Sequence, residues 1–157
     1  MTSPVGPPPS WQIMEKLRVA LELISPANGF YTAPSITTEL PALNDRDAYP
    51  VVLLTEESSP VESHTISAVK VSHRVVAEGY IPANYKNAMF IAAQLKWDLT
   101  QAFMRVKSST LNPLESGTVA TFEITGDRPT LRRPDGMNYI IVQVRAVVTY
   151  SEFVPGA

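Results

Sequence analysis

Two long segments with alternating apolar and polar side chains constrain the fold of this chain most strongly. Residues 65–81 and 137–150 both show this period of two, which is typical of β-strands with one buried face. The apolar face of the first comprises Val69, Val71, His73, Val75, Ala77 and Ile81; that of the second comprises Ile140, Val142, Val144, Ala146, Val148 and Tyr150. Strands usually have about 5–6 residues. This length predicts a bulge, strong curvature or a covering partner subunit, with Gly79 as a candidate bend.

Proline marks the borders of the other elements. The chain has 14 prolines in 157 residues, nearly double the usual share of about 5%. Proline lacks an amide donor and has a fixed φ, so it belongs at the edges of helices and strands. The sequence between prolines predicts two helices, 11–24 with Ser10 as N-cap and 85–106 with Asn84 as N-cap. Helical spacing identifies their apolar stripes as Met14, Leu17, Leu21 and Ile24 in the first, and Ala88, Ala92, Leu95, Leu99 and Ala102 in the second.

The remaining segments complete an α+β pattern. Residues 30–40 are weakly extended, 49–55 and 118–125 are predicted strands, and 126–136 form a turn-rich loop. The order α-β-β-β-α-β-β predicts one domain with a mixed or antiparallel twisted sheet of four to five strands, flanked by two helices. We assign a proline-rich arm to residues 1–9, the domain to 10–152 and a C-terminal tail to 153–157.

Composition excludes several classes of protein. The absence of cysteine excludes a disulfide scaffold and a cysteine nucleophile. A net charge of −2 argues against a strongly basic nucleic-acid binder. No apolar run approaches the roughly 20 residues of a membrane helix, and the N-terminus lacks the pattern of a signal peptide. Only 18% of the residues are charged, against a usual value of about 25%.

Catalytic chemistry is weakly represented. His64 and His73 have opposite parity on the predicted long strand, so they cannot form a ligand pair there. The sequence contains no Gly-x-Ser-x-Gly motif, no glycine-rich phosphate loop and no spacing of metal ligands. We therefore expect no enzyme activity, no cofactor and no metal. A small-ligand pocket would have only His73, Arg74 and Asp98 as candidate polar lining.

Interaction signals are clearer. The loop 126–136 carries three arginines, which can pair bidentately with carboxylates or phosphates or simply face solvent. The candidate interface residues are Arg128, Arg132 and Arg133 in this loop, and Asp45, Asp47, Glu56 and Glu57 in acidic segments. Residues 4–7 fit the Pro-x-x-Pro ligand pattern. Residues 1–78 carry a net charge of −4 and residues 79–157 carry +2, an asymmetry that suits head-to-tail association.

The order of elements resembles a known family. The amphipathic first helix is followed by a strand containing YPVV at 49–52, an acidic turn at 56–57, and a long strand ending VAEGYI at 76–81. A helix with AMFIAAQLKWDL at 88–99 and a strand ending VVTY at 147–150 complete the pattern. Over residues 10–152 the chain is similar to the tail terminator, or tail completion, proteins of tailed bacteriophages.

This resemblance implies a non-enzymatic structural subunit of the virion tail or neck, assembled in the host bacterial cytoplasm. It implies a homo-oligomeric ring, a hexamer in this family. The ring caps the head-proximal end of the tail tube, ends its polymerisation and joins the head-tail connector. DNA would pass through the lumen without specific or lasting contact, and no membrane would be involved. Alternatives are a head-closure or head–tail adaptor protein, a tail-tube subunit, or a small-ligand-binding α+β domain.

Overall fold

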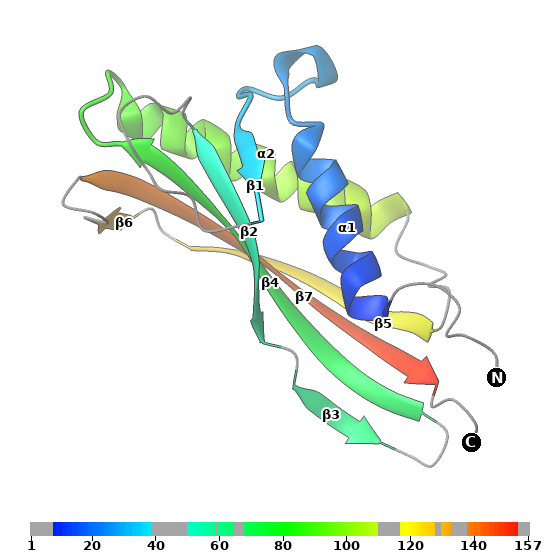
Figure 1. Cartoon of the computed structure of the whole chain (residues 1–157). Helices are drawn as coiled ribbons and strands as arrows, with labels where there is room; N and C mark the ends of the chain where they lie inside the picture. The colour runs from blue at the N-terminus through cyan, green and yellow to red at the C-terminus, as the bar shows by residue number, and fades with distance from the viewer. Residues whose placement is uncertain are drawn as a thin grey trace.

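The computed structural model describes residues 8–38, 50–58, 60–64, 68–109, 117–127, 130–132 and 138–153. Within them, two helices lie on one face of a mixed β-sheet (Figure 1). The elements are α1 (Pro9–Glu22), the 3-10 turn η1 (Pro26–Asn28), β1 (Ser35–Thr37), β2 (Val51–Ser58), β3 (Val61–His64), β4 (Ala68–Pro82), α2 (Ala88–Ser109), β5 (Gly117–Gly126), β6 (Thr130–Arg132) and β7 (Tyr139–Phe153). The predicted α+β class is confirmed, and the order matches except for the short strands β3 and β6.

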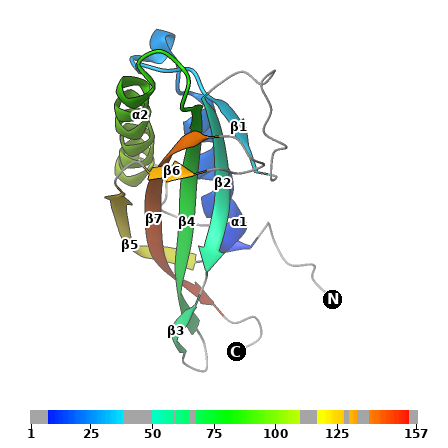
Figure 2. The same ribbon diagram turned by 90° about the vertical axis from the view of Figure 1, so that its left-hand side faces the viewer.

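The sheet is built around the two long strands. Its main path is β1-β2-β4-β7-β5; β1 is parallel to β2 and the other neighbours are antiparallel. β4 and β7 pair residue by residue from Ala68 opposite Phe153 to Pro82 opposite Tyr139. Each strand is 15 residues long, so the alternation in the sequence correctly identified the centre of the sheet. Figure 2 shows this ribbon running the length of the molecule.

Shorter strands follow one another along both outer edges of the ribbon. β2 and then β3 pair with β4, while β5 and then β6 pair with β7. Two predictions are therefore wrong. His64 lies on β3, opposite Val69 of β4, and not on the same strand as His73. The predicted loop 126–136 contains β6, in which Arg132 pairs with Tyr139.

α1 begins earlier than predicted. Pro9 is the first helical residue, so the helix takes one residue from the predicted arm, and Ser10 is not the N-cap. Pro8 holds the N-cap position, where its carbonyl accepts a hydrogen bond from Gln12 N at 3.0 Å. Proline suits a first helical position because its φ is already helical and its missing N–H has no partner there. At the other end of the chain, Phe153 belongs to β7 and not to the predicted tail.

α2 begins later than predicted. Turns occupy residues 83–87, the helix begins at Ala88, and the carbonyl of Asn87 accepts a hydrogen bond from Ile91 N at 3.0 Å. Asn84 is therefore not the N-cap. The predicted stripe Ala88, Ala92, Leu95, Leu99 and Ala102 is entirely buried against the sheet, as its helical spacing required.

Gly79 has a packing role that the sequence did not reveal. β4 pairs without interruption through Gly79, and the register shifts lie in β2 between Glu56 and Ser58 and in β5 between Val119 and Thr121. β4 therefore has no bulge at Gly79. A Cβ at this position would collide with Cδ2 of Leu95. Glycine allows α2 to lie close to the sheet.

Candidate interaction surface

The polar residues considered for a ligand site do not converge in the structure. His73 is buried on the helix-covered face of the sheet. Arg74, the next residue of β4, is exposed, and Asp98 lies on α2. Within the described ranges, no group of three or more His, Asp or Glu side chains could hold a metal ion. None of these three side chains lines either of the two surface grooves described below.

Asp98 fastens the segment after η1 to α2. Its carboxylate accepts hydrogen bonds from Tyr31 N at 3.1 Å, from Thr32 N at 2.8 Å and from Thr32 Oγ1 at 2.6 Å. Asp98 is fully buried, so these donors replace the water that a carboxylate needs. These hydrogen bonds give Asp98 a structural role, and they hold Tyr31 on the outer surface beside α2.

His73 is also a structural residue. Its side chain is fully buried, and Nδ1 lies 3.9 Å from Glu56 Oε1 at the edge of the sheet. Burial lowers the pKa of His73 because the charged imidazolium loses solvation, while the charge of Glu56 opposes this shift. The imidazole is therefore neutral near pH 7. Glu56, one of the predicted interface residues, lies half-exposed beside it.

A polar network lies on the opposite face of the sheet. Arg145 on β7 bonds through Nε to Glu57 at 3.0 Å and pairs through Nη1 with Asp127. On the same face, Glu78 accepts hydrogen bonds from Tyr80 and Gln143. Glu57, a predicted interface residue, thus has a partner within its own chain. Of the other predicted interface residues, Asp45, Asp47, Arg128 and Arg133 lie outside the described residues, and the backbone of Arg132 lies in β6.

The most unusual surface is the outer side of α2. Phe90, Trp97 and Met104 are seven residues apart, two helical turns at each step, so they lie in one row, which we call the α2 ridge. They are 63%, 56% and 45% exposed, respectively. Lone exposed apolar residues are ordinary, but a row on the side opposite the buried stripe makes α2 apolar on two sides. A helix of that kind is normally covered on both.

A shallow groove lies along one end of this ridge. Its lining residues are Tyr31, Phe90, Ala93, Gln94 and Trp97, and its volume is about 390 Å³. We call it the aromatic groove. Tyr31 is 62% exposed and is held there by the hydrogen bonds of its own backbone and that of Thr32 to Asp98. Sequence reasoning missed this surface, although the seven-residue spacing of Phe90, Trp97 and Met104 was a visible signal.

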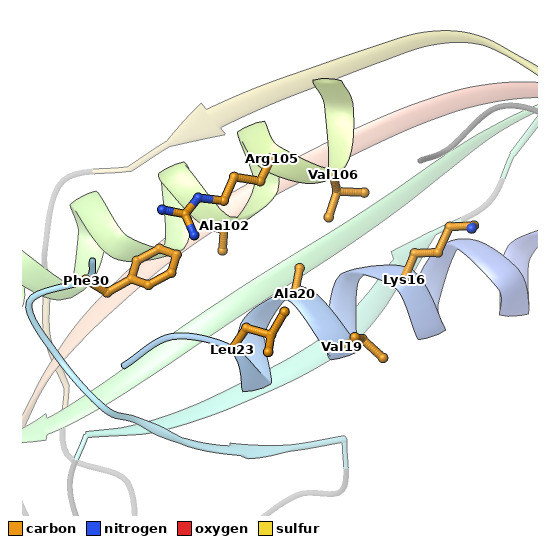
Figure 3. Close-up of a pocket in the computed structure, with 8 residues that line it drawn as sticks. All are labelled: Lys16, Val19, Ala20, Leu23, Phe30, Ala102, Arg105 and Val106. Atoms are coloured by element: carbon orange, nitrogen blue, oxygen red, sulfur yellow. The ribbon is translucent and has the colours of Figure 1, made fainter. Parts of the chain in front are cut away.

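A second groove lies between the two helices (Figure 3). It has a volume of about 240 Å³, and its lining residues are Lys16, Val19, Ala20, Leu23, Phe30, Ala102, Arg105 and Val106. The guanidinium of Arg105 lies 4.2 Å from the centre of the Phe30 ring, a cation–π contact. Val19 and Leu23 are about half exposed. The apolar exposure of the helical layer therefore continues from α2 to α1.

Comparisons with known proteins add no family assignment: no family model matches the chain, and no curated protein matches it in sequence. None of the helices in the described part of the chain is long and apolar enough to cross a membrane. The candidate site is thus defined by its surface chemistry. Its α2 ridge and aromatic groove consist of uncharged, mostly aromatic and aliphatic side chains, and most of them lie on a helix that is packed against the sheet.

Proposed function

We propose that this chain is a structural subunit of a bacteriophage tail or neck that forms a homo-oligomeric ring. In this role it would act as a tail terminator, without catalysis, in virions assembled in the bacterial cytoplasm. The observation that carries the proposal is the apolar outer side of α2, where Phe90, Trp97 and Met104 are exposed in one row. Such a row is expected where another subunit covers the helix.

Two further features support an assembly subunit. Charged residues make up only 18% of the chain, which suits a subunit whose neighbours cover much of its surface. The polar side chains that could have formed a catalytic or ligand site serve the fold, since Asp98 binds Tyr31 and Thr32 and His73 is buried. The order of elements that resembles tail terminators supports the choice of a ring at the end of a tail tube. Its partners would be the tube protein and the head-tail connector, and DNA would pass through the lumen.

The mass of the full-length chain in solution tests this proposal. We expect sedimentation at micromolar concentration to give one closed oligomer, a hexamer if the family resemblance holds. Electron microscopy of the same sample should show rings. Long filaments would instead identify a tail-tube subunit. A strict monomer, both alone and in the presence of purified tail tubes, would contradict the ring.

A further inference from the structure

The aromatic groove has the chemistry of a site for proline-rich segments. Its three exposed rings belong to Tyr31, Phe90 and Trp97, with the small residue Ala93 beside them. Gln94, the indole N–H of Trp97 and the hydroxyl of Tyr31 are hydrogen-bond donors, and no lining residue is charged. Proline-rich ligands bind to grooves of this kind, because polyproline II helices offer flat apolar rings and free backbone carbonyls.

The chain itself carries a segment that matches this groove. Residues 1–9, MTSPVGPPP, contain four prolines and no charged residue. In a polyproline II helix, which has three residues per turn, Pro4 and Pro7 lie on the same edge, about 9 Å apart. Phe90 and Trp97 are two helical turns apart on α2, a separation of about 11 Å. The spacing of the two prolines along the segment is therefore close to the spacing of Phe90 and Trp97 along the helix axis.

We propose that the aromatic groove of one subunit binds the proline-rich segment 1–7 of a second copy of this chain. Reach argues against binding within one subunit. The segment precedes Pro8 at the start of α1, whereas Tyr31 follows the far end of that helix, and α1 with its 14 residues is about 21 Å long. Seven residues in polyproline II conformation span about 22 Å. A segment that runs back along its own helix would need its whole length to reach the far end of α1, and no residues would remain to lie in the groove.

Binding of each arm by the next subunit produces a directional contact. A donor segment on one face and an acceptor groove on another form a heterologous interface, which closes into a ring when the rotation between subunits allows it. In this respect the inference rests on the proposed ring function and names the contact that would join neighbouring subunits. It also gives a role to the Pro-x-x-Pro pattern at residues 4–7.

A fluorescence titration tests the docking directly. Trp11→Phe leaves Trp97 as the only tryptophan, and Pro4→Ser with Pro7→Ser in the same full-length chain prevents its own arm from competing. Pro8 and Pro9 stay, because they begin α1. A synthetic peptide of residues 1–9, which has no aromatic residue, should shift the Trp97 emission to shorter wavelength in a saturable way. We expect the peptide with serine at positions 4 and 7 to bind about tenfold more weakly. No saturable shift, or equal binding of both peptides, overturns the docking.

Assembly of full-length variants separates this inference from the ring itself. The Pro4→Ser, Pro7→Ser chain and Trp97→Ala should each lose the oligomer in sedimentation, whereas Met89→Ala, at an exposed position of α2 outside both the α2 ridge and the aromatic groove, should keep it. If the proline variant assembles like the natural chain, the ring stands and the arm contact is overturned. If the natural chain forms no closed ring but associates into open oligomers that the proline variant loses, and the peptide binds, the ring function fails and the docking stands. Loss of assembly in Met104→Ala but not in the proline variant would show that α2 packs directly on another copy, and would overturn the arm contact.

Discussion

The two sides of α2 carry similar residues in opposite environments. Leu95, Leu99 and Phe103 are fully buried against the sheet, while Phe90, Trp97 and Met104 on the other side are exposed. The apolar character of a side chain therefore does not decide which side of α2 is buried within the single chain. The inner side explains how the chain folds, and folding of the single chain does not account for the apolar character of the outer side. In the proposed oligomer, the outer side is the one that would face a neighbouring subunit.

The faces of the sheet strengthen the comparison. The helix-covered face is buried in a large hydrophobic core that includes both helices. The opposite face has a small apolar cluster around Tyr80 and Tyr139, followed by the network of Arg145 with Glu57 and Asp127. The outer side of α2 differs from this face of the sheet. Its exposed side chains Phe90, Trp97 and Met104 are apolar, and they form no ion-pair network.

The largest effect is expected on the inner side of α2. Phe103→Ala should lower the free energy of unfolding by about 3–5 kcal/mol, because it removes a fully buried ring and leaves a cavity. Urea denaturation followed by circular dichroism measures this loss. A loss below 1 kcal/mol on this side would mean that α2 is not held by the core, and the contrast between its two sides would disappear.

A slightly smaller loss is expected where α2 holds the segment of Tyr31. Asp98→Ala leaves the N–H groups of Tyr31 and Thr32 and the hydroxyl of Thr32 without their acceptor. We expect the free energy of unfolding to fall by about 3 kcal/mol, because hydrogen bonds to charged groups contribute about 1.5–3 kcal/mol. Thr32→Val, which removes only the hydroxyl, should cost about 1 kcal/mol. Equal losses in the two variants would show that the backbone bonds to Asp98 contribute nothing.

The buried histidine predicts a pH dependence. Because burial lowers the pKa of His73 in the folded chain below its ordinary value of 6.5, the unfolded chain binds more protons as the pH falls through that value. Stability should therefore fall below pH 6.5 until the folded pKa is reached, by at most about 1.4 kcal/mol per pH unit. His73→Gln should lack this part of the slope in urea denaturation measured between pH 5 and 8. Parallel curves for the two proteins would contradict the assignment of a neutral buried imidazole.

Much of the fold could be predicted from local pattern. Alternation identified β4 and β7, and helical spacing identified the inner stripe of α2, because each element must bury one face. The short strands β3 and β6 were missed because they pair only where β4 and β7 continue beside them. Asp98 and Gly79 could not be interpreted because their partners, Tyr31 and Leu95, are distant in sequence.

The candidate site was harder to predict for a different reason. Periodicity shows which side chains a helix can bury against its own domain, and in α2 that requirement is met by the inner stripe alone. Phe90 and Trp97 lie outside that stripe and are exposed in the single chain, so only the proposed contact with a second molecule would bury them. The polar residues nominated from the sequence were chosen for their charge, yet Glu57 has an intramolecular partner in Arg145. Charge is easier to notice in a sequence, but the distinctive surface is uncharged.

The smallest effect on stability is expected for Phe90→Ala, the matched control for Phe103→Ala on the same helix. Phe90 is 63% exposed, so truncation removes little buried area, and exposed substitutions usually change stability by less than about 0.5 kcal/mol. Alanine is also the better helix former by several tenths of a kcal/mol, so the isolated subunit should unfold at an equal or slightly higher urea concentration. The measurement uses chain dilute enough to be monomeric, because any contact that covers Phe90 would add apparent stability at higher concentration. A loss of 2 kcal/mol or more in the monomer would mean that Phe90 is covered within its own chain, and the outer side of α2 would then belong to the folding core.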